Sequence, residues 1–225
     1  MMINLFSIFD PMNNIMNFSL NWISSLLCLL FFPIMFWLIP NRSLLMINLI
    51  SKMLHQEFKI LLGKNSFNGT TFLFLSIFFT ILLNNLMGLF PYTFTSTSHM
   101  VQSISISLTL WMTLMLYGWI NNTNHMFTHL IPMNTPMMLT SFMALIETIS
   151  NFIRPGTLSI RLTANMIAGH LLLTLLSSMS NHLMWYMILF LLLTQILLLI
   201  LEIAVAIIQS YVFATLSNLY SSEIN

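Results

Sequence analysis

The amino-acid sequence predicts an all-α integral membrane protein. We expect about five membrane-embedded helices, a further amphipathic helix at the membrane interface, and a final antiparallel hairpin of two long, tilted helices. Hydrophobic residues make up 58% of the 225 residues and charged residues only 5%, whereas soluble domains carry about 25% charged residues. The mean hydropathy is +0.91. Several uncharged apolar runs also reach the roughly 20 residues that a helix needs to cross a bilayer.

The length of the chain limits its organisation. At about 20 residues per span, five or six helices use up the 225 residues, so a single membrane domain over 1–225 is expected. The net charge of +1 gives no indication of nucleic-acid binding. Cys28 is the single cysteine, which excludes an intrachain disulfide. Residues 1–17 show neither a signal-peptide pattern nor an Arg-rich transit helix.

The first two elements differ in charge. Residues 18–39 form an uncharged apolar stretch that is long enough to span. Residues 41–64 are strongly charged, with one polar stripe and one apolar face, which is typical of a helix lying in the membrane interface. The stripe consists of Lys52, His55, Gln56 and Lys59, and the apolar face of Ile50, Met53, Leu54, Phe58 and Leu61. A solvated loop is the alternative.

Two more spans are expected at 71–90 and 100–120, followed by long helices at 137–179 and 183–219. The first long helix far exceeds a perpendicular crossing, so it should be tilted and should bend near Arg154-Pro155-Gly156. The Lys and Arg residues outside the spans all lie in the first connection, which should face the inner side of the membrane. This rule places the amino terminus outside and the carboxyl terminus inside. His125 and His129 have a metal-binding spacing, but with no third ligand we expect no metal site.

One long helix carries a cation inside an apolar run. Arg161, Ala164, Asn165 and Ala168 share one helical face. An intramembrane charge is costly and by default marks a functional site. Small residues allow a neighbouring helix to approach closely in lipid. The face therefore predicts contact with another protein.

The other long helix carries a polar stripe that matches the first. Gln195, Glu202 and Gln209 repeat every seven residues and fall on one face. One antiparallel register would pair three sets of residues: Arg161 with Gln209, His170 with Glu202, and Glu147 with Glu223.

Four strings carry a resemblance to a known family: Glu147–Ser150, Ile160–Leu172, Leu201–Phe213 and Asn85–Thr95. They resemble subunit a of mitochondrial F-type ATP synthase, also called ATP synthase subunit 6, which is the proton-channel subunit of the membrane sector. The resemblance extends from about residue 20 to the end of the chain. It implies two aqueous half-channels that carry protons to and from a rotating ring of small proteolipid subunits, so that proton flow is coupled to ATP synthesis.

The resemblance also implies roles for individual residues. Arg161 would be the essential cation facing the ring, His170 and Glu202 would relay protons on the outer side, and Glu147 would belong to the matrix-side half-channel. Asn165, Gln209 and Gln195 would be supporting polar residues. The implied partners are the proteolipid ring and other membrane-sector and peripheral-stalk subunits, in the mitochondrial inner membrane with the amino terminus in the intermembrane space. No cofactor and no nucleotide site are expected on this chain.

Simpler interpretations stay open for each residue. Arg161 could pair with Glu202 or Glu147, His170 could be a core histidine, and Glu147 could complement a helix dipole. Asn165 and Gln209 could serve packing alone. Arg154 could pair with Glu147, and the family suggests no role for it. A proton-pumping or quinone-site subunit of a respiratory oxidoreductase is the alternative function, and a non-conducting scaffold is a third.

Overall fold

The computed structural model describes residues 5–12, 18–33, 38–63, 69–90, 93–131, 136–180 and 184–224. Within these ranges the chain is helical and contains no strand, which confirms the predicted fold class. Four helical segments are long and apolar enough to cross a membrane: Thr70–Gly88, Met100–Asn121, Met137–Met179 and Tyr186–Ile224.

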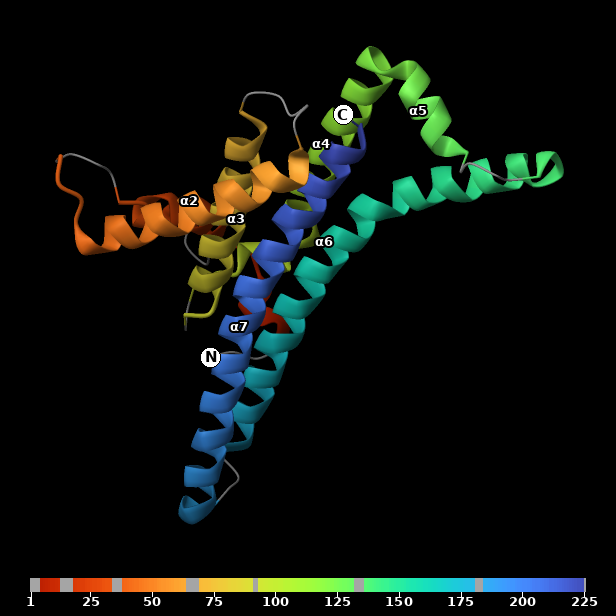
Figure 1. Cartoon of the computed structure of the whole chain (residues 1–225). Helices are drawn as coiled ribbons and strands as arrows, with labels where there is room; N and C mark the ends of the chain where they lie inside the picture. The colour runs from red at the N-terminus through yellow and green to blue at the C-terminus, as the bar shows by residue number, and fades with distance from the viewer. Residues whose placement is uncertain are drawn as a thin grey trace.

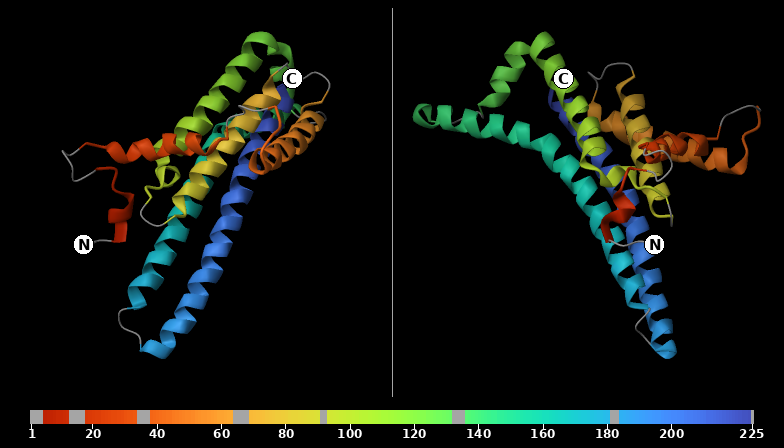
Figure 2. Two further views of the ribbon diagram at one scale, coloured as in Figure 1. Left: turned by 90° about the vertical axis from the view of Figure 1, so that its left-hand side faces the viewer. Right: turned by 180° about the vertical axis from the view of Figure 1, so that it is seen from behind.

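Two long helices form the axis of the molecule. Helix α6 (Thr140–Met179) and helix α7 (Trp185–Ile224) each contain 40 residues, so each is about 60 Å long at 1.5 Å per residue. They run antiparallel and side by side, as Figures 1 and 2 show. The predicted hairpin is therefore present; its turn at 181–183 lies outside the described residues. Helix α6 continues through Pro155 and is visibly curved in Figure 1.

Two shorter helices pack along the hairpin. Helix α3 (Thr70–Gly88) contacts α7, and helix α4 (Met100–Asn121) contacts α6. A buried cluster of four residues joins three helices: Ile81 of α3, Leu158 and Leu162 of α6, and Phe213 of α7. Because one side of α6 is buried against α3 and α7, only the α6 residues on its other sides stay exposed.

Helix α2 (Arg42–Leu62) lies across α3 and α7 (Figure 1). Its buried residues Leu54 and Phe58 pack with phenylalanines of α3, and Asn218 of α7 donates a hydrogen bond of 3.2 Å to the carbonyl of Phe58. Lys52 and Lys59 are exposed. Met53, on the predicted apolar face, is 68% exposed, so only part of that face contacts the protein. The location of α2 at the membrane interface stays a prediction.

The first apolar segment is shorter than the 18–39 span that the sequence predicts. Its helical part consists of η2 (Leu20–Ile23), α1 (Ser24–Leu27) and η3 (Cys28–Phe31), after which Phe32 is extended with φ −75° and ψ 116°. Pro33 follows directly, and a residue that precedes proline is disfavoured in the helical region because its backbone clashes with the proline ring. The next part of the predicted span, 34–37, lies outside the described residues.

The remaining elements connect these helices. They are η1 (Leu5–Phe9), η4 (Ser96–Ser98), α5 (Thr123–Leu130) and η5 (Met137–Leu139). The end of α7 lies against α4, where a Cβ added at Gly118 would come within 2.7 Å of Cγ2 of Ile224. The side-chain amide of Asn122 donates to the carbonyl of Ile224 at 3.3 Å. The carboxyl-terminal turn of α7 is therefore held beside the end of α4.

Candidate functional site

The face of α6 that carries Arg161 is open. Arg161, Ala164 and Ala168 are exposed and Asn165 is half-buried, whereas Leu158 and Leu162 on the adjoining side of the helix are buried against α3 and α7. Within the described residues Arg161 forms no ion pair. The simpler interpretation that Arg161 pairs with Glu202 or Glu147 therefore has no contact to support it. The packing leaves a guanidinium among small side chains, available to a neighbour.

Glu202 lies at the contact between α6 and α7, beside the residue that precedes His170. A Cβ added at Gly169 would come within 2.6 Å of Oε1 of Glu202, so any larger residue there would force this carboxylate to move. Glu202 is 8% exposed, and neither of its oxygens has a hydrogen-bond partner within the described residues. A buried carboxylate without partners is unfavourable unless it takes up a proton or contacts water. Glu202 is thus suited to accept and release a proton.

His170 lines a large open cleft of about 1220 Å³. Its Nε2 is buried without a hydrogen-bond partner in the described part of the chain. Gln195 of α7 lies in the same cleft, together with Asp10 from the amino-terminal segment. The ring of Phe9 approaches the His170 ring edge-on, with 6.4 Å between the ring centroids. The sequence gives no signal for this approach, because no periodic pattern links η1 to α6.

The predicted supporting residues are only partly connected. Gln195 lines the cleft with His170, and Gln209 is half-buried on α7. Among the described residues, no hydrogen bond joins Arg161 to Gln209 or to Asn165. The proposed support of the guanidinium by these two amides stays a prediction.

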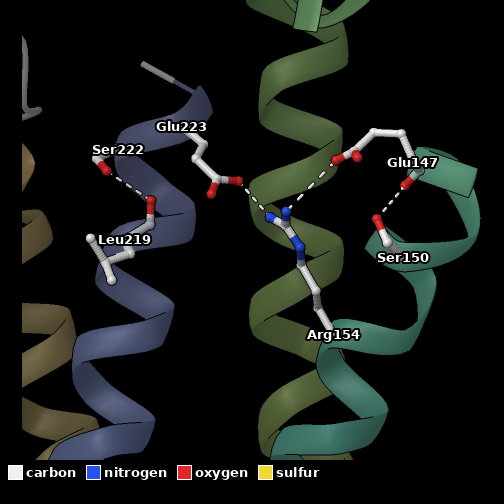
Figure 3. A network of polar contacts seen from close by, with 6 residues as sticks. All are labelled: Glu147, Ser150, Arg154, Leu219, Ser222 and Glu223. Carbon is white, nitrogen blue, oxygen red and sulfur yellow. Dashed lines mark hydrogen bonds and ion pairs between the residues drawn. The ribbon is translucent and has the colours of Figure 1, made fainter. Parts of the chain in front are cut away.

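A second group of charges lies nearer the start of α6. Nη2 of Arg154 is 3.7 Å from Oε1 of Glu147, and Nη1 donates to Oε2 of Glu223 on α7. Figure 3 shows Arg154 pointing between the two carboxylates. The pairing of Arg154 with Glu147, one possibility left open by the sequence, is present. Glu147 and Glu223 are also brought together, though through Arg154 rather than by direct pairing.

This charge group lines a cavity of about 60 Å³, which has room for water because one water needs about 10–15 Å³. Asn151 and Ser217 add polar groups to its wall. Glu147 lies about 21 Å from Arg161 along the helix in one direction, and His170 about 14 Å in the other, from 1.5 Å per residue. The cavity that holds this charge group and the open cleft thus lie toward opposite ends of α6, with Arg161 between them. Such an arrangement can deliver protons to two different depths.

Comparisons with known proteins assign the family. A family model described as ATP synthase A chain matches residues 18–222. "ATP synthase subunit a" of Locusta migratoria is 63% identical over 224 residues, and that of Drosophila melanogaster is 61% identical over 225 residues. The protein of the same name from Aedes aegypti is 59% identical over 226 residues. Each of these alignments covers 100% of this chain and 100% of the relative. The chain therefore belongs to the ATP synthase A chain family.

Proposed function

We propose that the chain forms two aqueous half-channels, separated by Arg161, through which protons pass to and from a ring of small proteolipid subunits. Membership of the ATP synthase A chain family makes the chain a proton-translocating subunit of the membrane sector. It gives no support to the oxidoreductase alternative. The observation that carries the finer proposal is the exposed Arg161 on a face of small residues, placed between the cavity that holds Glu147 and the open cleft that holds His170.

Arg161 acts on a carboxylate of the ring. A nearby cation favours the ionised form of a carboxyl group, so a protonated ring carboxyl that arrives beside Arg161 releases its proton into the exit route. A guanidinium stays charged at physiological pH. The same charge repels protons and prevents them from passing directly from one half-channel to the other.

His170 and Glu202 form the outer relay. A proton enters the cleft, is taken up at the imidazole, and reaches the carboxylate of Glu202 through water. Gly169 allows Glu202 to lie against the backbone of α6 beside His170. From Glu202 the proton passes to the ring.

Glu147 forms part of the opposite, matrix-side route. It lines the small cavity with Arg154 and Glu223, at the end of α6 away from His170. The chain is a multi-pass membrane protein with several apolar helices. We propose the mitochondrial inner membrane as its location, with the amino terminus in the intermembrane space, because the basic residues Arg42, Lys52, Lys59 and Lys64 gather in one connection. The remaining proposed partners are peripheral-stalk subunits, and nucleotide chemistry belongs to other subunits.

The proposal is tested with Arg161→Ala in the assembled ATP synthase. In inverted membrane vesicles, ATP-driven acidification should be lost, because no fixed cation drives the ring carboxyl to release its proton. The amount of assembled complex should stay near normal, because Arg161 makes no ion pair in the described structure.

The matched control is Lys52→Ala, which removes an exposed cation from α2. Acidification at the normal rate in the Arg161→Ala complex would contradict the proposed role. Loss of acidification in both variants would show only that the complex tolerates no loss of charge.

A further inference from the structure

We propose that Arg154 is a positioning residue of the matrix-side route. It holds Glu147 of α6 and Glu223 of α7 at the wall of one cavity, so that the two carboxylates act as a single proton relay. This inference rests on the proposed function and extends it to two residues, Arg154 and Glu223, for which the sequence suggested no role in proton transfer.

The guanidinium group joins two helices. One nitrogen, Nη2, lies 3.7 Å from Oε1 of Glu147, while Nη1 donates to Oε2 of Glu223. Arginine presents several N–H donors in a fixed planar fork, so one side chain can hold two acceptors in a defined geometry. Figure 3 shows the two carboxylates approaching Arg154 from different helices.

Tyr220 fixes the position of the Arg154 guanidinium group. The guanidinium carbon of Arg154 lies 4.8 Å from the centroid of the Tyr220 ring, which is a cation–π distance. Tyr220 belongs to the same helix as Glu223, one turn earlier. Arg154 is therefore held by α7 at two points and by Glu147 of its own helix at a third.

The ion pairs are too exposed to serve mainly as stabilising contacts. The side chains of Arg154, Glu147 and Glu223 are 26%, 39% and 45% exposed. Ion pairs that are partly open to solvent contribute little to stability, because water already satisfies both charges. The chief consequence of this geometry is the placement of the two carboxylates.

The group of three charges can hold one proton. With both carboxylates ionised, its net charge is −1, and uptake of one proton makes it neutral. Within the 60 Å³ cavity, an O–H bond on one carboxyl breaks as water takes its proton, and an O–H bond forms on the other carboxylate. The charge of the group is unchanged by this transfer. Without Arg154, the two negative groups would repel one another and separate, which would lengthen the path.

The test uses Arg154→Met and Arg154→Lys in the assembled complex. After the nucleotide-hydrolysing head is removed from vesicle membranes, passive proton conduction is measured per assembled complex. Arg154→Met should lower conduction about tenfold, since misplaced groups slow proton transfer steeply. Arg154→Lys should restore about half of the normal rate, because an ammonium keeps the charge but lacks the fork.

A double variant separates positioning from simple packing. If Arg154 acts through Glu223, then Arg154→Met combined with Glu223→Gln should conduct no less than Glu223→Gln alone, because residues that act as a unit are not additive. Lys52→Met, on the exposed side of α2, is the control and should conduct normally.

Three outcomes would overturn the inference. They are normal conduction with Arg154→Met, equal loss with methionine and lysine, and fully additive losses in the double variant. Any of them, with ATP-driven pumping still lost in Arg161→Ala, would leave the proposed function standing. Normal pumping in Arg161→Ala would instead remove the proposed function itself.

Discussion

Arg154 and Arg161 lie on the same helix and, seven residues apart, at nearly the same angle around its axis. Their surroundings differ completely. Arg154 contacts two carboxylates and an aromatic ring, whereas Arg161 is exposed and forms no ion pair within the described residues. The difference comes from Glu147 of α6 and from Tyr220 and Glu223 of α7, which surround Arg154 but have no charged counterpart beside Arg161 within the described residues. In the roles proposed above, one residue type serves either to hold other groups of the chain or to act on a carboxylate of the ring.

The largest change in proton pumping is expected when arginine is replaced by lysine at each of the two positions in turn, and it should occur at Arg161. Arg161→Lys should lower ATP-driven proton pumping by more than tenfold, because a flexible, strongly hydrated ammonium cannot replace a guanidinium facing a carboxylate. Arg154→Lys should lower it about twofold. Quenching of a pH-sensitive dye in vesicles measures both rates. Equal effects would mean that the two arginines do not differ in role.

Glu202→Gln should have the next largest effect. The amide cannot take up a proton, so pumping and passive conduction should both fall about tenfold. This is less than the roughly hundredfold or larger effect typical of general acid–base groups, because His170 remains to carry protons. Insulation between the half-channels should persist because Arg161 is unchanged. A normal flux would assign Glu202 to packing.

A smaller effect is expected from Gly169→Ala. The added Cβ would lie 2.6 Å from Oε1 of Glu202, so the carboxylate must move. Its side chain is flexible, and the complex should assemble normally while proton conduction falls about threefold.

Gly156→Ala is the matched control on the same helix, because a Cβ there would meet nothing within 4 Å. Conduction in this control should equal that of the unmodified complex. If Gly169→Ala also conducts normally, the close contact with Glu202 has no bearing on the relay.

The smallest effects should come from Asn165→Leu and Gln209→Leu. Neither amide has a hydrogen bond to Arg161 within the described residues, so each variant should retain more than about half of its proton conduction. A loss as large as that of Glu202→Gln would show that the amides hold the guanidinium in the assembled complex.

Much of this arrangement could be predicted from the sequence because charges are rare in it. Ionisable residues inside apolar runs stand out, and the helical period places Arg161 on a face of small residues. The seven-residue spacing of Arg154 and Glu147 places them on nearly the same helical face, which made their pairing possible. The antiparallel order of the last two helices also indicated that Glu147 and Glu223 would lie close together.

Contacts between distant segments could not be predicted in the same way. Through tertiary packing, Phe9 contacts the ring of His170 and Asp10 lines the same cleft. Tyr220 lies over Arg154 because of the way α6 crosses α7. Neither follows from a periodic pattern. In the first apolar segment, the local effect of Pro33 outweighs the hydropathy that predicted a span over 18–39.

The most direct test is whether the open face of α6 contacts the ring. A photoreactive crosslinker attached at Ala168→Cys, in the assembled complex, should join this chain to a small proteolipid subunit. The same probe at Phe72→Cys, exposed on α3, should not. Crosslinks from Ala168→Cys to other subunits or to lipid alone, with no proteolipid product, would contradict the claim that Arg161 faces the ring.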